Sequence, residues 1–274
     1  MRKPYILSLT LIGALFLLVG CSEYQRALKT PDAELKYEVA KELFAEEKYE
    51  KAYPLFDALL KLYRGTQKAA EVYYYFAETN FYLEDYLLAA YHYKNFAKTF
   101  PNHPKTQTAY YMVGYCYYLQ SPRYNLDQTY TYKAINELQL FVNLYPSSDK
   151  LMESNELIDE LRAKLERKAY ERAHLYYHTE NYQAAVVSFN SVLDEFPDTE
   201  YRQDVLYYRA LSSYRLAENS IASKQLQRFI ESRTAFREFI DRYPETGLAG
   251  NLKDYLTEIN TQIKSLKQNT PLES

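Results

Sequence analysis

The chain has 274 residues, with 33 Lys and Arg against 36 Asp and Glu and a formal net charge of −3. This balance argues against nucleic acid as a partner, since phosphate binding requires a positively charged surface. Aromatic side chains are abundant, with 32 Tyr and 13 Phe, but there is no Trp and only six Gly. Scarce glycine suits helices whereas tyrosine favours strands, so composition alone leaves the fold class open.

The first twenty residues are typical of a secretory signal. Arg2 and Lys3 precede an apolar run at 5–19, which is shorter than the roughly 20 residues that a helix needs to cross a bilayer. The run ends in LVGC, which resembles the lipobox of bacterial lipoproteins, where cleavage occurs before a cysteine that carries a diacylglycerol. We therefore predict a lipoprotein signal peptide at 1–20, lipidation of Cys21 and a lipidated linker at 21–32. A plain signal peptide and an uncleaved anchor are the alternatives.

A recurring phrase follows, in which an aromatic residue, a few polar residues, Tyr and Ala precede an apolar periodic stretch. It occurs as FAEEKYEKAYPLFDALLKLYR, YLEDYLLAAYHYKNFAKTFP and YHTENYQAAVVSFNSVLDEFP. These segments resemble tetratricopeptide repeats, which are helix-turn-helix units of about 34 residues. The resemblance predicts an all-α solenoid of five such repeats.

Small residues mark where the two helices of each repeat cross, and a proline closes four of the repeats. A bulky substitution at a crossing is expected to overpack the unit at a cost of about 1–3 kcal/mol. Phe56, Tyr93, Leu138, Phe189 and Leu226 are the predicted core positions of the second helices. The crossing residues are Ala40, Ala77, Gly114, Ala173 and Ala210 in the first helices and Ala52, Ala89, Ala134, Ala185 and Ala222 in the second, with closing prolines at Pro101, Pro146, Pro197 and Pro244.

The spacing of the repeats predicts how the chain is organised. Repeats one to three occupy 33–146, and repeat three carries an insertion, SPRYNLDQTYTY, between its helices. One shared helix of about 30 residues, capped by Ser147 or Ser148, leads into repeats four and five at 147–245. The second helix of repeat five is extended through ESRTAFREFIDRYP. The segment 246–274 is predicted to be an amphipathic capping helix and a tail.

The first helices carry two rows of aromatic residues, seven positions apart, along what is the concave wall in this repeat type. Tyrosine combines contact area, few rotors and a polar tip, which suits a partly wet groove that binds extended, aromatic-rich chains. Plain packing between neighbouring helices is the alternative interpretation. The predicted peptide-binding residues are Tyr37, Phe44, Tyr74, Phe81, Tyr111, Tyr118, Tyr170, Tyr177, Tyr207 and Tyr214.

Signals for catalysis, metals or cofactors are weak. The six glycines form no phosphate loop, and the spacing of Glu171, His174 and His178 is metal-like but lacks any supporting ligand motif. We interpret the acidic run at 153–160, with Glu153, Glu156, Asp159 and Glu160, as a solvated helix face. Cys116 has no disulfide partner once Cys21 is lipidated and is expected to be a small core residue. We therefore predict no catalytic residue, no metal site and no cofactor.

The lipobox, five repeats, the insertion with Asp127 and Gln128, the phrase LFVNLYPSS and the long helix occur in an order that resembles the BamD family. This family comprises outer-membrane lipoproteins of the β-barrel assembly machine. The resemblance covers residues 21 to 245, and the abundant tyrosines, the longer fifth repeat and the tail depart from it.

The resemblance implies a non-catalytic subunit on the periplasmic face of the outer membrane, anchored by lipid at Cys21. Its C-terminal half would bind the POTRA region of a BamA-like barrel protein, and its N-terminal repeats would receive unfolded outer-membrane proteins. Other lipoproteins of the machine are further partners that it implies. The alternative is a lipid-anchored repeat adaptor for a different envelope complex, serving cell wall or polysaccharide.

Overall fold

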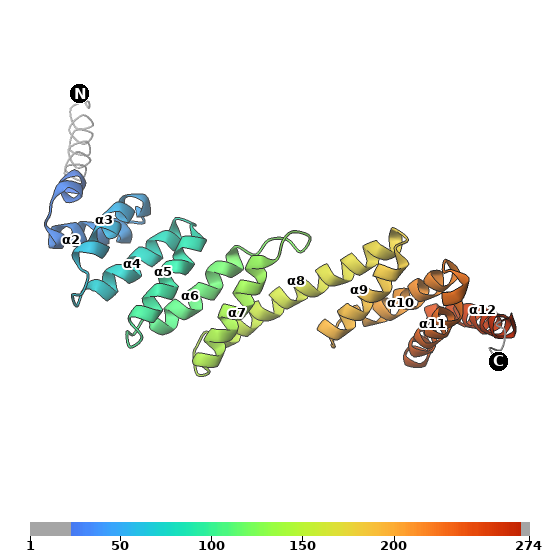
Figure 1. Cartoon of the computed structure of the whole chain (residues 1–274). Helices are drawn as coiled ribbons and strands as arrows, with labels where there is room; N and C mark the ends of the chain where they lie inside the picture. The colour runs from blue at the N-terminus through green and yellow to red at the C-terminus, as the bar shows by residue number, and fades with distance from the viewer. Residues whose placement is uncertain (1–22, 270–274) are drawn as a thin grey trace, which may run out of the picture. The chain divides into compact units, whose positions relative to one another are not determined.

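The computed structural model describes residues 23–269, so the predicted signal peptide and Cys21 lie outside the described residues. Within this range every regular element is a helix (Figure 1), and the all-α fold of tetratricopeptide hairpins is confirmed. The helices are α2 (Ala33–Ala45), α3 (Tyr49–Leu62), α4 (Ala69–Tyr82), α5 (Tyr86–Thr99), α6 (Thr106–Leu119), α7 (Thr129–Leu144), α8 (Leu151–His178), α9 (Tyr182–Glu195), α10 (Arg202–Glu218), α11 (Ala222–Arg242) and α12 (Gly247–Asn269).

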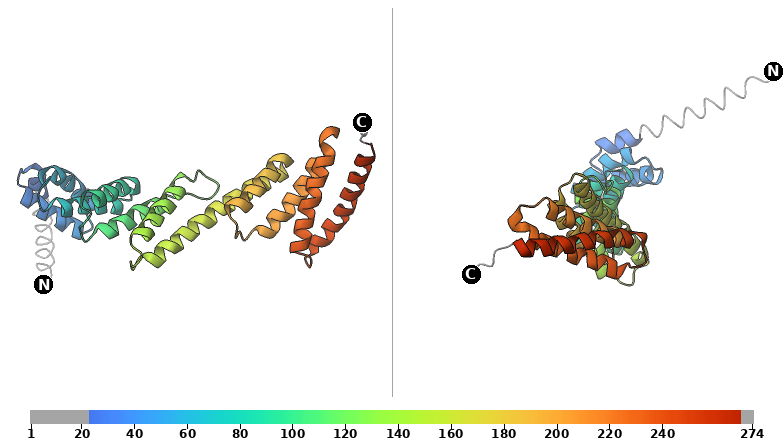
Figure 2. Two further views of the ribbon diagram at one scale, coloured as in Figure 1. Left: turned by 60° about the horizontal axis from the view of Figure 1, so that its bottom comes forward. Right: turned by 90° about the vertical axis from the view of Figure 1, so that its right-hand side faces the viewer.

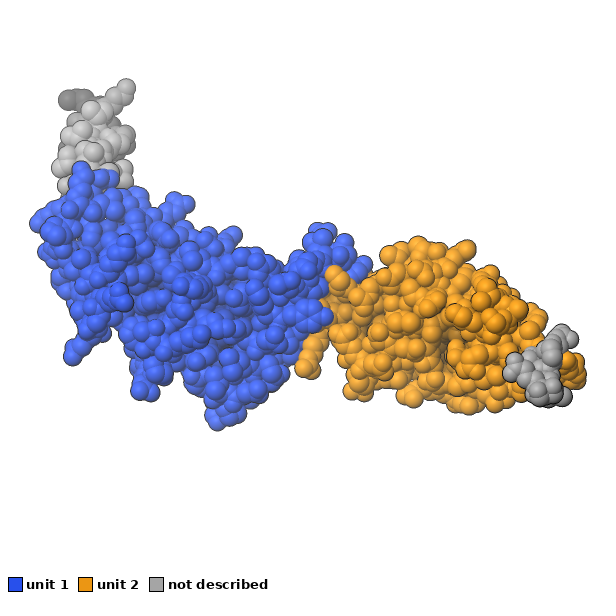
Figure 3. Space-filling view, viewed as in Figure 1, with its two compact units in different colours: residues 1–161 blue, residues 162–274 orange. Residues whose placement is uncertain are grey.

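The chain divides into two compact units between Leu161 and Arg162, within α8 (Figure 3). The boundary expected from the repeats, after residue 146, lies just before this helix. In the first unit the hairpins α2–α3, α4–α5 and α6–α7 follow one another, and each shares a buried apolar cluster with the next element (Figures 1 and 2). In the second unit the end of α8 pairs with α9, and α10 pairs with α11.

Helix α8 is the predicted shared helix. Its first half contributes Ile158 and Leu161 to a cluster with α6 and α7, and its second half contributes Ala169 and Ala173 to a cluster with α9 and α10. The helix begins at Leu151, later than expected from a cap at position 147 or 148. Ser148 instead accepts a hydrogen bond at Oγ from the backbone N–H of Lys150, so it stabilises the turn before the helix.

The helix ends follow from local sequence. Helices α5, α7, α9 and α11 each end two residues before their closing proline, which cannot donate the backbone hydrogen bond that would continue a helix. Three hairpin turns place a glutamate at a positive φ near 60°, at Glu47, Glu84 and Glu180. Helix α3 is followed by Gly65, whose φ of 80° lies in the region that glycine adopts without strain.

The insertion of repeat three is shorter than expected, because Thr129–Tyr132 already belong to α7. Gln128 is buried and donates from Nε2 to the carbonyls of Arg123, at 2.8 Å, and Leu126, at 3.0 Å. Asp127 accepts at Oδ1 from the N–H of Thr129. The Asp-Gln pair therefore closes the loop and starts the helix.

Most of the crossing residues are buried as predicted. In the second helix of repeat five, however, the predicted crossing position lies ten residues before the observed one. Ala222 is exposed at the first turn of α11, and Leu226 is only half-buried. Ser232, Phe236 and Phe239 are buried instead, with the spacing that Ala185, Phe189 and Val192 have in repeat four. The prediction of Ala222 and Leu226 as crossing and core positions is wrong, because α10 continues further past its crossing residue, Ala210, than the first helices of the other repeats do, and α11 is longer than the other second helices.

Residues 23–29, within the predicted linker, are helical and pack on the first hairpin. Ala27 is fully buried in the cluster of α2, α3 and α4. Lys36 is buried, at 4 % exposure, and its ammonium donates to the carbonyls of Ala27 and Leu28 at the end of this short helix. The segment that follows position 22 is therefore held against the first repeat.

The amphipathic C-terminal segment forms α12. Leu252, Ile259 and Ile263 are buried against α10 and α11, and Tyr255 meets the ring of Tyr214 at 5.0 Å. Helix α12 thus covers apolar surface that α10 and α11 would otherwise expose.

Candidate functional site

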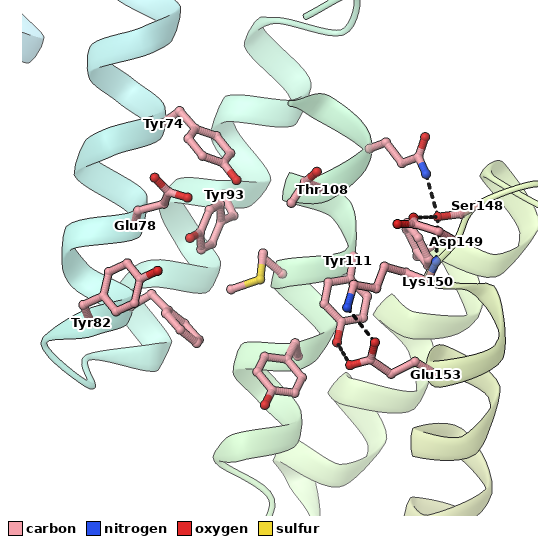
Figure 4. Close-up of a pocket in the computed structure, with 15 residues that line it drawn as sticks. Tyr74, Glu78, Tyr82, Tyr93, Thr108, Tyr111, Ser148, Asp149, Lys150 and Glu153 are labelled. Atoms are coloured by element: carbon pink, nitrogen blue, oxygen red, sulfur yellow. Dashed lines mark hydrogen bonds and ion pairs between the residues drawn. The ribbon is translucent and has the colours of Figure 1, made fainter. Parts of the chain in front are cut away.

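A hollow of about 490 Å³ opens in the first unit between α4, α6 and the start of α8 (Figure 4). Most of its wall comes from the first helices of successive repeats, which is the wall that sequence assigned to peptide binding. The lining residues are Tyr74, Glu78, Phe81, Tyr82, Tyr93, Gln107, Thr108, Tyr111, Met112, Tyr115, Phe141, Ser148, Asp149, Lys150 and Glu153.

The α8 side of the hollow is a polar network built on Glu153. Tyr111 donates from its hydroxyl to Oε1 of Glu153 at 2.6 Å, and Lys150 donates from Nζ to Oε2 at 2.7 Å. The Lys150 ammonium also lies 5.4 Å from the centre of the Tyr111 ring. Lys150 and then Tyr111 lower the pKa of the Glu153 carboxyl, while burial and then Glu153 raise the pKa of Tyr111. This wall therefore holds a paired, ionised carboxylate.

A second tyrosine–glutamate contact lies two helical turns further on, outside the hollow. Tyr118 donates to Oε2 of Glu160 at 2.7 Å, and this hydrogen bond, followed by burial, raises the pKa of Tyr118 to about 12. The interpretation of the acidic run as a solvated face holds for Glu156, Asp159 and Glu160, which are exposed, although Glu160 also accepts a hydrogen bond from α6. Glu153 departs from it, because it is half-buried and accepts from Tyr111.

The α4 side of the hollow carries Tyr74, Glu78 and Tyr82, which lie on one helix face because they are four residues apart (Figure 4). Burial raises the pKa of the Glu78 carboxyl; the charge of Lys105 and a hydrogen bond from Tyr74 act in the opposite direction. The Lys105 ammonium lies 5.0 Å from the centre of the Tyr74 ring.

A second hollow of about 300 Å³ lies beside the turn of the first repeat and shares Tyr82 with the first. Tyr82 is 49 % exposed and stacks on Tyr49, with ring centres 4.6 Å apart and planes at 9°. The exposed ring of Tyr82 therefore contributes to the walls of both hollows. The second hollow is lined by Glu47, Lys48, Tyr49, Glu50, Lys51, Tyr82 and Leu83.

Of the ten aromatic residues predicted from sequence, three line the larger hollow: Tyr74, Phe81 and Tyr111. Tyr37 is buried, at 2 % exposure, among the first repeat and α4. Phe44 contacts the rings of Tyr49, Phe56, Tyr75 and Tyr82.

The four positions in the second unit pack mainly against other rings of that unit. Tyr170 stacks on Tyr201 at 4.4 Å, Tyr177 meets Tyr208 at 5.1 Å, Tyr207 meets Phe239 at 5.7 Å and buried Tyr214 lies under α12. Packing thus explains much of both rows, and peptide binding by them stays a prediction.

Sequence reasoning missed Glu78, Tyr82 and Lys150. The signal for the first two was present, because Glu78 and Tyr82 follow Tyr74 at intervals of four on the same helix face. Lys150 carries no such signal, since its position depends on the turn that starts α8.

The histidines of α8 whose spacing resembles a metal site pack against each other and against a tyrosine. The ring centres of His174 and His178 are 4.3 Å apart, and those of His174 and Tyr208 are 4.5 Å apart. Burial lowers the pKa of His174. Over residues 23–269, no group of three or more His, Cys, Asp or Glu side chains is placed to hold a metal ion.

Over the same residues, none of the helices combines the length and the apolar character that crossing a bilayer requires. Cys116 is buried, and burial raises the pKa of its thiol to about 12.

The sequence matches one described family over most of its length. Residues 29–228 match the family described as YfiO, outer membrane lipoprotein. The outer membrane protein assembly factor BamD of Caulobacter vibrioides is 26 % identical over 119 residues, which is 43 % of this chain and 39 % of that protein. The match therefore spans about two fifths of the relative's length.

Solved structures with similar folds include two tetratricopeptide proteins. The TPR2AB domain of yeast Sti1, in a complex with pHSP90, has a TM-score of 0.39 and 12 % identity, with 85 % of this chain and 86 % of that chain covered. The TPR domain of P58(IPK) has a TM-score of 0.39 and 15 % identity, with 95 % and 64 % covered.

Proposed function

Because the chain belongs to the YfiO family of outer-membrane lipoproteins, we propose that it is a non-catalytic subunit of the β-barrel assembly machine. In this proposal it scaffolds a BamA-like barrel protein through the POTRA region and receives unfolded outer-membrane proteins for insertion. The name of the Caulobacter relative, an outer membrane protein assembly factor, supports this assignment. Other lipoproteins of the machine are further proposed partners.

The proposed anchor is the acylated Cys21, which would place the protein on the periplasmic face of the outer membrane. Several acyl chains at one residue bind a bilayer far more firmly than a single myristoyl chain, at roughly 0.8 kcal/mol for each buried CH₂. The packing of residues 23–29 on the first repeat supports a short connection between the lipid and the first unit.

The observation that carries the proposal of a client site is the pair of hollows that share Tyr82 as a lining residue. Their walls contain Tyr74, Phe81, Tyr82, Tyr111 and Tyr115, which offer large apolar contact area with polar tips. Two hollows on either side of one shared residue suit an extended chain better than a compact small molecule. Aromatic-rich strands of unfolded barrel proteins are such chains.

The whole proposal is tested by a pull-down of the full-length lipoprotein from membranes under conditions that preserve lipids, with mass spectrometry. Recovery of a POTRA-barrel protein is expected, and depletion of the lipoprotein should lower the level of outer-membrane proteins. Recovery of a cell-wall enzyme or a polysaccharide polymerase in its place would overturn the assignment and favour the alternative adaptor role.

The client site is tested by replacing Tyr82 with Ala. Because Tyr82 is about half exposed and lines both hollows, the loss of its ring should weaken binding of a barrel-protein C-terminal peptide by about five- to tenfold. Fluorescence anisotropy with the full chain measures this affinity.

The matched control for this experiment is Tyr91→Ala, since Tyr91 is 59 % exposed on α5 and lines neither hollow. It should leave peptide affinity unchanged. Equal affinities of the Tyr82 and Tyr91 variants would contradict a peptide site at this position. Replacing Tyr74 or Tyr111 is a poorer test, because both are 5 % exposed and their loss would destabilise the fold.

A further inference from the structure

Glu78 occupies the centre of the α4 wall and is flanked by aromatic rings. Tyr74 and Tyr82 lie one turn before and one turn after it, and Tyr93 reaches the same wall from α5 (Figure 4). The close-up places the Glu78 carboxylate among these three side chains, at the open hollow. A carboxylate beside the electron-rich faces of tyrosines is an arrangement that attracts a cation.

Of the other two carboxylates of the hollow, Glu153 accepts from the Lys150 ammonium and from Tyr111. Asp149 is exposed and accepts from the hydroxyl of Ser148 at 3.3 Å, and a carboxylate that water already solvates gains little from a cation. Among the described residues no cation lies within ion-pair distance of Glu78; Lys105 acts on it only from a distance and lies over the Tyr74 ring. Glu78 is half-buried and accepts a hydrogen bond from Tyr74, and it is therefore the carboxylate of this hollow that combines partial burial with the lack of a cation in direct contact.

The environment of Glu78 makes such a charge favourable. Burial raises its pKa more than Lys105 and Tyr74 lower it, which means that the ionised form lacks full compensation for its partial loss of water. A cation in direct contact would supply that compensation through a charge-assisted hydrogen bond. The same cation would contact the exposed ring of Tyr82.

On this basis, and resting on the proposed function, we infer that Glu78 and the exposed ring of Tyr82 bind a Lys or Arg side chain of the client polypeptide. We infer a side chain of an extended chain because a second hollow, which also uses Tyr82 as part of its wall, lies beside the turn of the first repeat. A single carboxylate provides too few ligands for a metal ion. The hollow thus selects clients in which a basic residue lies close to aromatic residues.

The test uses two labelled peptides from the C-terminal strand of a barrel protein. They are identical except that one carries a lysine near its aromatic residues and the other carries norleucine at that position. Affinities are measured with the full-length chain, with Glu78→Gln and with Glu156→Gln, which removes an exposed carboxylate on α8 outside the hollow. Thermal melting of each variant confirms that it is folded.

The lysine peptide should bind the wild-type chain and the Glu156 variant about tenfold more tightly than the norleucine peptide, as expected for one charge-assisted contact at a partly exposed site. The Glu78 variant should bind both peptides with the affinity that the wild type has for norleucine. Equal affinities of the wild type for the two peptides, or a lysine preference retained by the Glu78 variant, would overturn the inference alone. Failure of both peptides to bind the wild type would overturn the client site together with it.

Discussion

Replacing Phe236 with Ala should lower the free energy of unfolding of the second unit by about 3–5 kcal/mol. Phe236 is fully buried where α10, α11 and α12 meet, and its ring lies 6.3 Å from that of Tyr214 and 6.0 Å from that of Tyr255. Removing the ring would leave a cavity lined by three helices that cannot all move to fill it. The lost free energy of unfolding therefore has two parts, the burial of the apolar ring and the cost of the cavity that remains.

Leu226→Ala is the matched control, because it lies on the same helix and is the position that sequence assigned to the core. It is half-buried at the edge of the same cluster, so its loss should cost only about 1–2 kcal/mol. Because the chain has no Trp, denaturant unfolding is followed by helical circular dichroism and localised by hydrogen exchange. A larger loss for Leu226 than for Phe236 would contradict the observed register of α11.

The register of repeat five shows how far sequence periodicity reaches. In repeats two to four the crossing residue lies twelve positions before the closing proline, as for Ala89 and Pro101. The same interval before Pro244 leads to Ser232, which is buried, and not to Ala222. Counting forward from the first helix failed because α10 and α11 are both lengthened. Counting back from the proline succeeds, because the helix end is fixed by local backbone chemistry.

The candidate site was predictable only in part. Helical spacing placed Tyr74, Phe81 and Tyr111 along one wall, because the period of a helix fixes which residues share a face. How deeply each ring is buried depends on how successive hairpins pack, which spacing within one hairpin does not determine. The pairing of Tyr111 with Glu153 depends on where α8 starts after the turn at Ser148. The contacts between helices, unlike the residues that share one helix face, could therefore not be predicted from the sequence.

The second large effect is expected from Gly114→Ala, which should destabilise the first unit by about 2 kcal/mol. A Cβ at this position would lie 2.7 Å from Cγ and Cδ2 of Leu138 and 3.0 Å from its backbone nitrogen. The backbone contact means that rotation of the leucine side chain alone does not remove the clash, and α6 and α7 must separate. Overpacking of this kind costs about 1–3 kcal/mol, and it outweighs the gain of up to about 1 kcal/mol in helix propensity.

Gly250→Ala separates the gain in helix propensity from the cost of overpacking, because a Cβ there meets nothing within 4 Å. In α12 the substitution should stabilise the second unit by about 0.5–1 kcal/mol, the propensity gain without a clash. Hydrogen exchange should show weaker protection of α6 and α7 in the Gly114 variant and unchanged protection of α6 and α7 in the Gly250 variant. If Gly114→Ala stabilised the first unit as Gly250→Ala stabilises the second, the close crossing of α6 and α7 would be wrong. The hollow would then lose its geometric basis, since α6 carries Tyr111 and α7 carries Phe141 into its wall.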